Sequence, residues 1–290
     1  MSDPLTVLAI DIGGTKLAAA RVTATGDVLG HETIPTGAGL AEDLWDQLAG
    51  LVDRVRTGDE VACGVGCGGP MRRGGDAVSP LNIPQWRGFP LRSRLATYVG
   101  LPVAVDNDAK ALALGEGWRG AARGVGNYLA MVVSTGVGGG IVLDGRLLDG
   151  AAGNAGHIGH VIVEPDGRRC ACGAQGCLEA EASGRAIRAI TGRPAVEAPD
   201  PIRQRTGTLV GRAVACVVNL LDLELAVVAG SVALGFGDAF FAAAQAELAT
   251  RAQLEFARGA RIVPAGLGPD GPIVGAAAVA RHTLGNLLRR

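Results

Sequence analysis

The sequence predicts an α/β protein with two lobes, and three observations indicate this. Apolar runs of strand length alternate with stretches whose apolar residues recur at helical spacing. A strand, a Gly-Thr turn and a second strand occur near the start of the chain and again near its middle, as a weak internal repeat. A length of 290 residues suits one large domain or two ordinary ones. We therefore expect lobes at 1–109 and 110–290, with the final helix free to pack back on the first lobe.

The first lobe begins with a β-hairpin. "LTVLAIDI" (5–12) is a continuous apolar run, "GGT" turns the chain, and "KLAAARV" (16–22) returns. A helix is predicted over 40–55, where apolar residues share one face: Leu40, Leu44, Leu48, Leu51 and Val55. A strand within 61–70 follows. The next stretch, "LPVAVDNDAKALALGEGWRG", gives a short strand to Val105 and a helix from about Ala109.

The second lobe repeats the theme. "YLAMVVSTGVGGGIVLDGRLL" (128–148) predicts a second hairpin with a Gly-rich turn. A helix, a strand and a Gly-Ser turn are predicted within 209–233, and a closing helix over 273–288.

Composition excludes several classes of function. A net charge of -1 without a basic cluster gives no footprint for nucleic acid. No 18-residue window is free of both charges and glycines, so we expect no membrane span. The N-terminus lacks the basic region and cleavage site of a signal peptide, which predicts a cytoplasmic chain.

The cysteines are unevenly distributed. Three of the six, and two of the four histidines, lie within the 21 positions 157–177, and this spacing indicates a metal. Cys63, Cys67 and Cys216 stand among small or apolar residues, and we expect them to be buried.

Three glycine-rich turns follow strands, at 11–16, 134–140 and 229–235. Glycine lets backbone N–H groups approach an anion, and Thr or Ser adds a hydroxyl, so such turns suit phosphates. Asp11 ends a buried strand, where it is placed to hold hydrated Mg²⁺. Because none of these three turns contains a Walker A motif or GxGxxG, the phosphate site has another architecture.

In this order the motifs resemble the ROK (repressor, open reading frame, kinase) family of sugar kinases and sugar-sensing regulators, over essentially the whole chain. "LAIDIGGTK", "STGVGGG" and "VVAGSV" are similar to its two phosphate motifs and its adenosine-side turn, and 133–160 follows its signature. The resemblance implies an actin-like, hexokinase-like (ribonuclease H-like) fold whose two lobes close over a central cleft. It also implies ATP-dependent phosphorylation of a sugar 6-hydroxyl and a homodimer or higher homo-oligomer.

The resemblance assigns roles to particular residues. Those implied for phosphates and Mg²⁺ are Asp11, Gly13, Gly14, Thr15, Lys16, Thr135 and Gly136, and those beside adenosine are Gly230 and Ser231. Asp108 would be the catalytic base, and the implied sugar contacts are Asn82, Asn107, His157, His160 and Glu179. The competing interpretation of 106–108 is that these residues only cap the following helix, and we keep it for Asp106.

The cysteine cluster has its own counterpart in the family. His160 lies ten residues before a C-x-C-x4-C pattern, and the implied ligands of a closed, structural Zn²⁺ site are His160, Cys170, Cys172 and Cys177. Zinc would then fix a loop that has little core of its own and hold the sugar-contacting residues in place.

One departure bears on the sugar. Most kinases of the family read E-x-G-H where this chain reads His157-Ile158-Gly159-His160. Neutral imidazole donates a hydrogen bond as well as accepting one, and an acetamido carbonyl requires a donor. "AGHIGH" resembles the bacterial N-acetylmannosamine kinases, whereas "SPLNIPQWRGFPL" resembles glucokinases. We favour N-acetylmannosamine and keep glucose as the alternative, with polyphosphate conceivable as donor.

Non-catalytic members of the family form the remaining alternative. Its repressors carry a helix-turn-helix module before the body, whereas here the first strand is predicted at about Leu5. Asp108 and both phosphate motifs argue against a sugar-sensing protein without activity.

Overall fold

The computed structural model describes residues 5–285 and divides the chain into two compact units. Unit 1 takes the residues up to Gly120, the segment Asp149–Ala155 and the residues from Leu267 on, and unit 2 takes the remainder. The boundary expected at 109/110 falls inside helix α3 (Asp108–Arg119), which belongs to unit 1 because it packs along helix α9 (Gly271–Thr283).

Within the described residues, unit 1 is built on a five-stranded sheet of order β3-β2-β1-β4-β5. Its strands are β1 (Thr6–Ile12), β2 (Lys16–Thr23), β3 (Val28–Pro35), β4 (Glu60–Cys67) and β5 (Val103–Asn107). β1 and β2 form the predicted hairpin, and β1, β4 and β5 run parallel. The edge strand β3 was not predicted, because none of its residues is buried and its apolar residues do not form a continuous run.

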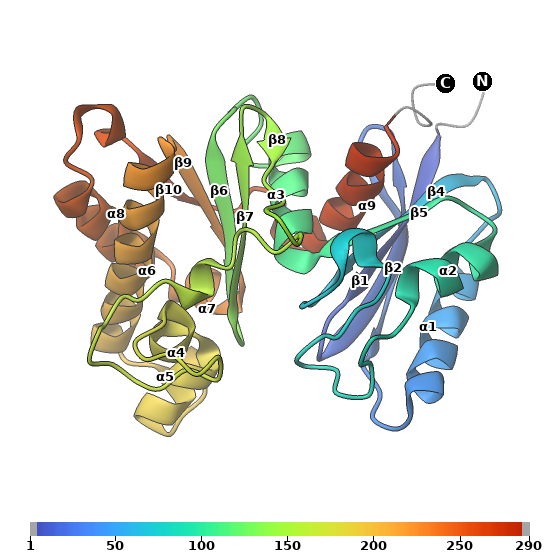
Figure 1. Cartoon of the computed structure of the whole chain (residues 1–290), viewed down its shortest axis with the longest axis horizontal. Helices are drawn as coiled ribbons and strands as arrows, with labels where there is room; N and C mark the ends of the chain where they lie inside the picture. The colour runs from blue at the N-terminus through green and yellow to red at the C-terminus, as the bar shows by residue number, and fades with distance from the viewer. Residues whose placement is uncertain (1–4, 286–290) are drawn as a thin grey trace. The chain divides into compact units, whose positions relative to one another are not determined.

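Helices cover both faces of this sheet (Figure 1). α1 (Ala41–Val55) and α2 (Leu91–Val99) pack on one face over a core that includes Leu8, Leu48 and Leu95. α9 covers the other face, where alanines of β1 and β2 meet alanines of the helix. A side chain at Gly64 of β4 would collide with the carbonyl of Ala276, so glycine lets α9 lie against the strand. Residues 286–288 of the closing helix expected at 273–288 lie outside the described residues.

Unit 2 has a second five-stranded sheet in the described chain, of order β10-β9-β6-β7-β8. Its strands are β6 (Tyr128–Val133), β7 (Val137–Leu143), β8 (Arg146–Leu147), β9 (Leu225–Ala229) and β10 (Arg261–Pro264). β6 and β7 form the second predicted hairpin, and β9 lies parallel to β6. The end of β6 and the end of β9 therefore lie at the same edge of the sheet (Figure 1).

The helices of unit 2 are α4 (Leu178–Ala182), α5 (Gly184–Thr191), α6 (Asp200–Leu221), α7 (Ser231–Phe236) and α8 (Asp238–Arg251). α6 and α8 approach closely at Gly207 and Gly211, where a side chain would collide with the carbonyls of Phe240 and Ala244.

The structure tests the burial expected for three cysteines. Cys63 and Cys67 are buried as expected. The expectation for Cys216 is wrong: it is exposed, because it lies on the face of α6 turned away from the core. No helix in residues 5–285 is long and apolar enough to cross a membrane.

Candidate active site

The register of unit 1 brings the predicted acidic residues together. Asp11 of β1 lies opposite Gly66 of β4, and Gly66 lies opposite Asp106 of β5. Asn107 is the last residue of β5, and Asp108 is the first residue of α3. Both therefore lie where β5 ends, at the edge of the sheet where β1 also ends. A side chain at Gly66 would come within 3.6 Å of Asp11 Oδ1 and 3.8 Å of Asp108 Cα. Gly66 therefore lies beside both the Asp11 carboxylate and the start of α3.

Asp11 has unusual electrostatics. Burial raises the pKa of its carboxyl group from 3.8 to about 7, the nearby charge of Asp108 contributes in the same direction, and Lys16 opposes both. A buried carboxylate beside a second carboxylate is stabilised in its charged form by a cation. The two side chains have the oxygen chemistry that Mg²⁺ prefers.

The start of α3 supports both interpretations of 106–108. Asn107 is the N-cap, and its Oδ1 accepts a 3.0 Å hydrogen bond from Ala109 N. Asp106 accepts a 2.7 Å bond from Asn107 N and lies 3.8 Å from Lys110 Nζ, which agrees with the structural role kept for it. Asp108 lies within the first turn and is close enough to Asp11 to raise its pKa.

The first glycine turn contacts the segment predicted to bind sugar. A side chain at Gly14 would collide with Asn82 Cβ and reach 3.1 Å from its carbonyl oxygen, so this approach requires glycine. The turn is closed by Gly13 N, which donates to Lys16 O at 3.0 Å. Trp86, which is fully buried, anchors the Asn82 segment by donating from Nε1 to Ala41 O at 3.1 Å.

In unit 2 the two remaining glycine turns meet. Ser134 Oγ lies 3.0 Å from Ser231 Oγ, and Ser134 N donates to Gly136 O across the Thr135 turn. Gly230 has a φ of +101°, and any side chain there would collide with the backbone of Val133. The residues implied for the phosphate and adenosine sides of the nucleotide are therefore neighbours within this unit.

Glu179 on α4 connects the sugar-binding set with the second phosphate turn. Its Oε2 accepts a 2.9 Å hydrogen bond from Val137 N, directly after Gly136. The guanidinium of Arg185 lies 3.6 Å from Oε1 of the same carboxylate. Glu179 is thus fixed by backbone on one side and by a cation on the other.

The predicted metal ligands form a compact group. The ligand atoms of His160, Cys170, Cys172 and Cys177 all lie within 4.8 Å of one another. His160 Nδ1 is 3.8 Å from Cys170 Sγ, and Cys172 Sγ is 3.7 Å from Cys177 Sγ. Bonds of about 2.3 Å from zinc to two sulfurs of a tetrahedron would separate those sulfurs by about 3.8 Å. The donor set and its spacing therefore fit Zn²⁺.

His157 lies beside this group without belonging to it. Its ring centroid is 6.2 Å from that of His160, and the rings are nearly parallel. Because Nδ1 of His160 faces the sulfurs, its Nε2 is the nitrogen left for a ligand other than the metal.

Comparison with known proteins decides the family. The family model of ROK proteins matches residues 7–283. The chain belongs to the ROK family. The hexokinase-like α/β fold that the resemblance implies is confirmed, and it contains two mixed sheets.

Two similar curated proteins are named as kinases of different sugars. A glucokinase from Streptomyces coelicolor is 41% identical over 181 residues, which are 62% of this chain and 57% of that relative. An N-acetylmannosamine kinase from Citrobacter koseri is 38% identical over 250 residues, 80% of this chain and 86% of the relative. Among solved structures, a ROK glucokinase from Streptomyces griseus in complex with glucose and AMPPNP is 30% identical. It has a TM-score of 0.83 over 95% of this chain and 99% of its own.

Sequence reasoning on this ROK chain missed two charged residues. One is Arg185, which pairs with Glu179 and follows it by six residues. The other, Lys110, lies 3.8 Å from Asp106, but Asp106 is on β5 and Lys110 on α3, so no helical spacing in the sequence identifies the pair.

Proposed function

We propose that this ROK protein is an ATP-dependent sugar kinase that phosphorylates the 6-hydroxyl of a hexose or N-acetylhexosamine. The observation that carries the proposal is the pair Asp11 and Asp108, which lie at the ends of β1 and β5 on either side of β4, together with a glycine turn that touches Asn82. Phosphoryl transfer needs phosphates held with a cation, an aligned hydroxyl and a group that receives its proton. The relatives named as sugar kinases support the same reaction.

Each residue has a part in the proposed reaction. Asp108 accepts the proton of the sugar hydroxyl, while Asn82 and Asn107 orient the sugar by hydrogen bonds. The backbone of Gly13, Gly14 and Gly136, with Thr15, Lys16 and Thr135, binds phosphate oxygens. Asp11 would hold Mg²⁺, which supplies positive charge to the phosphates when bound. His157, His160 and Glu179 complete the proposed sugar contacts, and Gly230 and Ser231 lie on the adenosine side.

We also propose a structural zinc ion held by the cysteine cluster, because one imidazole and three thiolates close its coordination. It would take no part in phosphoryl transfer and would keep His160 and the loop before Glu179 in place. The homo-oligomer and the cytoplasmic location implied by the sequence remain predictions.

The choice of sugar rests on His157. An imidazole N–H is a suitable donor for an acetamido carbonyl, which favours N-acetylmannosamine. Glucose is the second candidate, favoured by the likeness to the Streptomyces glucokinases.

A coupled ADP-release assay with N-acetylmannosamine, glucose, mannose and N-acetylglucosamine tests the proposal on wild type and Asp108→Asn. We expect activity on one sugar and a loss of about 10²–10⁴-fold in the variant, the usual contribution of a general base. Retention of full activity by Asp108→Asn would refute its role. Sugar binding without ADP release in the wild type would favour the sensor alternative.

A further inference from the structure

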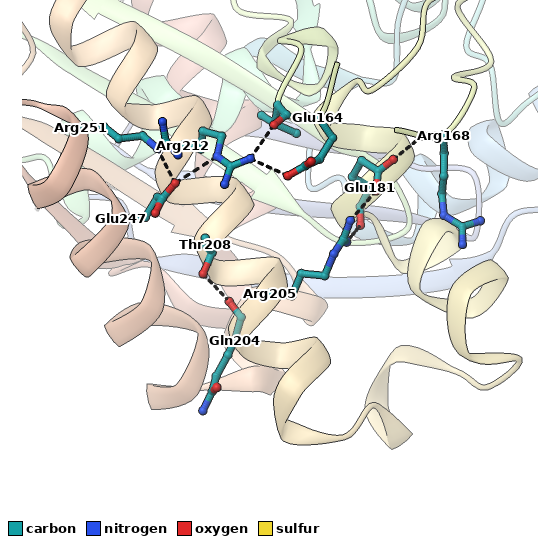
Figure 2. A network of polar contacts seen from close by, with 10 residues as sticks. Glu164, Arg168, Glu181, Gln204, Arg205, Thr208, Arg212, Glu247 and Arg251 are labelled. Carbon is teal, nitrogen blue, oxygen red and sulfur yellow. Dashed lines mark hydrogen bonds and ion pairs between the residues drawn. The ribbon is translucent and has the colours of Figure 1, made fainter. Parts of the chain in front are cut away.

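Three residues at alternate positions of the short helix α4 and its N-cap contact different parts of the protein. Cys177, its N-cap, belongs to the cysteine cluster, and Glu179 is a proposed sugar contact. Glu181 is only 2% exposed and points toward α6 (Figure 2). Its Oε2 accepts a 2.6 Å hydrogen bond from Arg205 Nη2, and its Oε1 accepts a 2.5 Å bond from Arg168 N. Arg205 Nη1 also donates to the Glu181 carbonyl at 3.1 Å, so one guanidinium holds both the side chain and the backbone of the same residue.

The contact between Arg205 and Glu181 helps to fix the position of α4, a helix of only five residues. So short a helix has little stability of its own, and its place is set by its tertiary contacts. A carboxylate as buried as Glu181 is stable only when it is paired and hydrogen-bonded, and here both oxygens are engaged. The planar fork of arginine fixes this geometry more strictly than a lysine would.

A second arginine of α6 contacts the start of the loop that leads to the cysteines. Arg212 follows Arg205 by seven residues, about two helical turns, and so lies on the same side of α6. Its Nη1 donates to Val163 O at 2.8 Å and to Glu164 Oε1 at 2.5 Å. Glu247 of α8 accepts from Arg212 Nε at 3.0 Å and also pairs with Arg251. α6 thus binds the loop before the cysteines at Val163–Glu164 and again, through Glu181, at Arg168.

We propose that Arg205 and Glu181 are a positioning pair that sets α4, and with it Glu179 and Cys177, for sugar and metal binding. The inference rests on the proposed function for its sugar part only. The hydrogen bond from Val137 N to Glu179 requires α4 to lie at one position along β7, and Arg205 fixes that position from the opposite side. Neither Arg205 nor Glu181 is among the proposed sugar contacts, and the pair would act through α4.

The test compares Arg205→Met, Arg205→Lys and Glu181→Gln with the control Thr208→Ala. Thr208 is on the same helix, and its exposed hydroxyl donates only to Gln204 O at 3.1 Å, one turn away (Figure 2). KM for sugar and KM for ATP are measured separately, together with zinc transfer from the folded protein to a chromophoric chelator. We expect Arg205→Met to raise sugar KM and to weaken zinc retention by about tenfold each, as loss of a residue that orients ligands does, with KM for ATP unchanged. Arg205→Lys and Glu181→Gln should fall between wild type and Arg205→Met.

The pair would be merely structural if the melting temperature falls while sugar KM and zinc transfer stay at wild-type values. Equal rises of both KM values would also overturn the proposal, since they indicate a general loss of order. If Arg205→Met does not fold, the two milder variants carry the same comparison. If the wild type phosphorylates no sugar, the proposed function fails, while zinc transfer and deuterium uptake over 161–182 still decide whether the pair positions α4.

Discussion

The ammonium group of Lys110, a residue only 2% exposed, lies 2.8 Å from the carboxylate of Asp149. Lys110 is on α3, two residues after the proposed base. Asp149 begins the segment Asp149–Ala155, which belongs to unit 1 although the residues before and after it in the chain belong to unit 2. A lysine this buried keeps its charge only with a partner, and Asp106 at 3.8 Å is the second one. The pair therefore ties the Asp149–Ala155 segment to α3.

Replacing Lys110 by methionine keeps most of the packing and removes the charge. We expect the free energy of unfolding to fall by about 2 kcal/mol, less than for a fully buried pair because Asp149 is 46% exposed. Urea titration measures this. Arg92→Met, which breaks an exposed pair with Asp76, is the control and should change stability by less than about 1 kcal/mol. Equal effects of the two variants would contradict the role of Lys110.

The raised pKa of Asp11 predicts that the protein becomes less stable as the pH rises toward 7. The pKa of its carboxyl group is 3.8 when the group is exposed and about 7 in the folded protein, chiefly because of burial. Between these values the folded state keeps a proton that the unfolded state has lost, so stability falls as pH rises from about 4 to about 7. In Asp11→Asn this contribution is absent. The stability of the variant relative to wild type should therefore increase from pH 5 to pH 8 in metal-free urea titrations, and a constant difference would disprove the shift.

His157 predicts a change in sugar preference. His157→Glu replaces a donor by a group that only accepts, so an acetamido carbonyl loses its partner. We expect kcat/KM for N-acetylmannosamine relative to glucose to fall about tenfold, which corresponds to one hydrogen bond of about 1.4 kcal/mol. His157→Gln retains an N–H donor and should keep more of the wild-type ratio. If both variants behave alike, His157 does not select the sugar through donation.

The cysteine cluster predicts one zinc ion per chain. Cys172→Ser removes an exposed ligand, and we expect loss of zinc, a lower melting temperature and weaker sugar binding. Cys216→Ser, which changes an exposed cysteine outside the cluster, is the matched control. Elemental analysis of purified protein measures the metal directly. Wild-type protein that is free of zinc, yet unaffected by Cys172→Ser, would exclude the site.

Features with local signals could be predicted from the sequence. Leu44, Leu48 and Leu51 recur at helical spacing and are all buried on α1, which spans 41–55 where 40–55 was predicted. The cysteine cluster was also local, because ligand spacing along the chain specifies it.

Features that depend on distant partners could not be predicted. Arg205 and Glu181 are 24 residues apart, and nothing in their spacing links them. α8 is rich in alanine and has only three buried side chains, so its periodicity is weak. The membership of α3 in unit 1 depends on its packing against α9, far along the chain.

The covering of the first sheet by α9 has a consequence for biosynthesis. β1 and β2 leave the ribosome before every other described strand and helix, and α9 leaves it after every other described helix. Until then the face formed by Val7, Ala9, Ala18 and Ala20 lacks most of its cover, because most of the helix residues that pack on it lie in α9. Unit 2 has all its segments by Gly266. The nascent chain can thus complete unit 2 first, while unit 1, which carries the proposed catalytic base, is completed only after α9 has been translated.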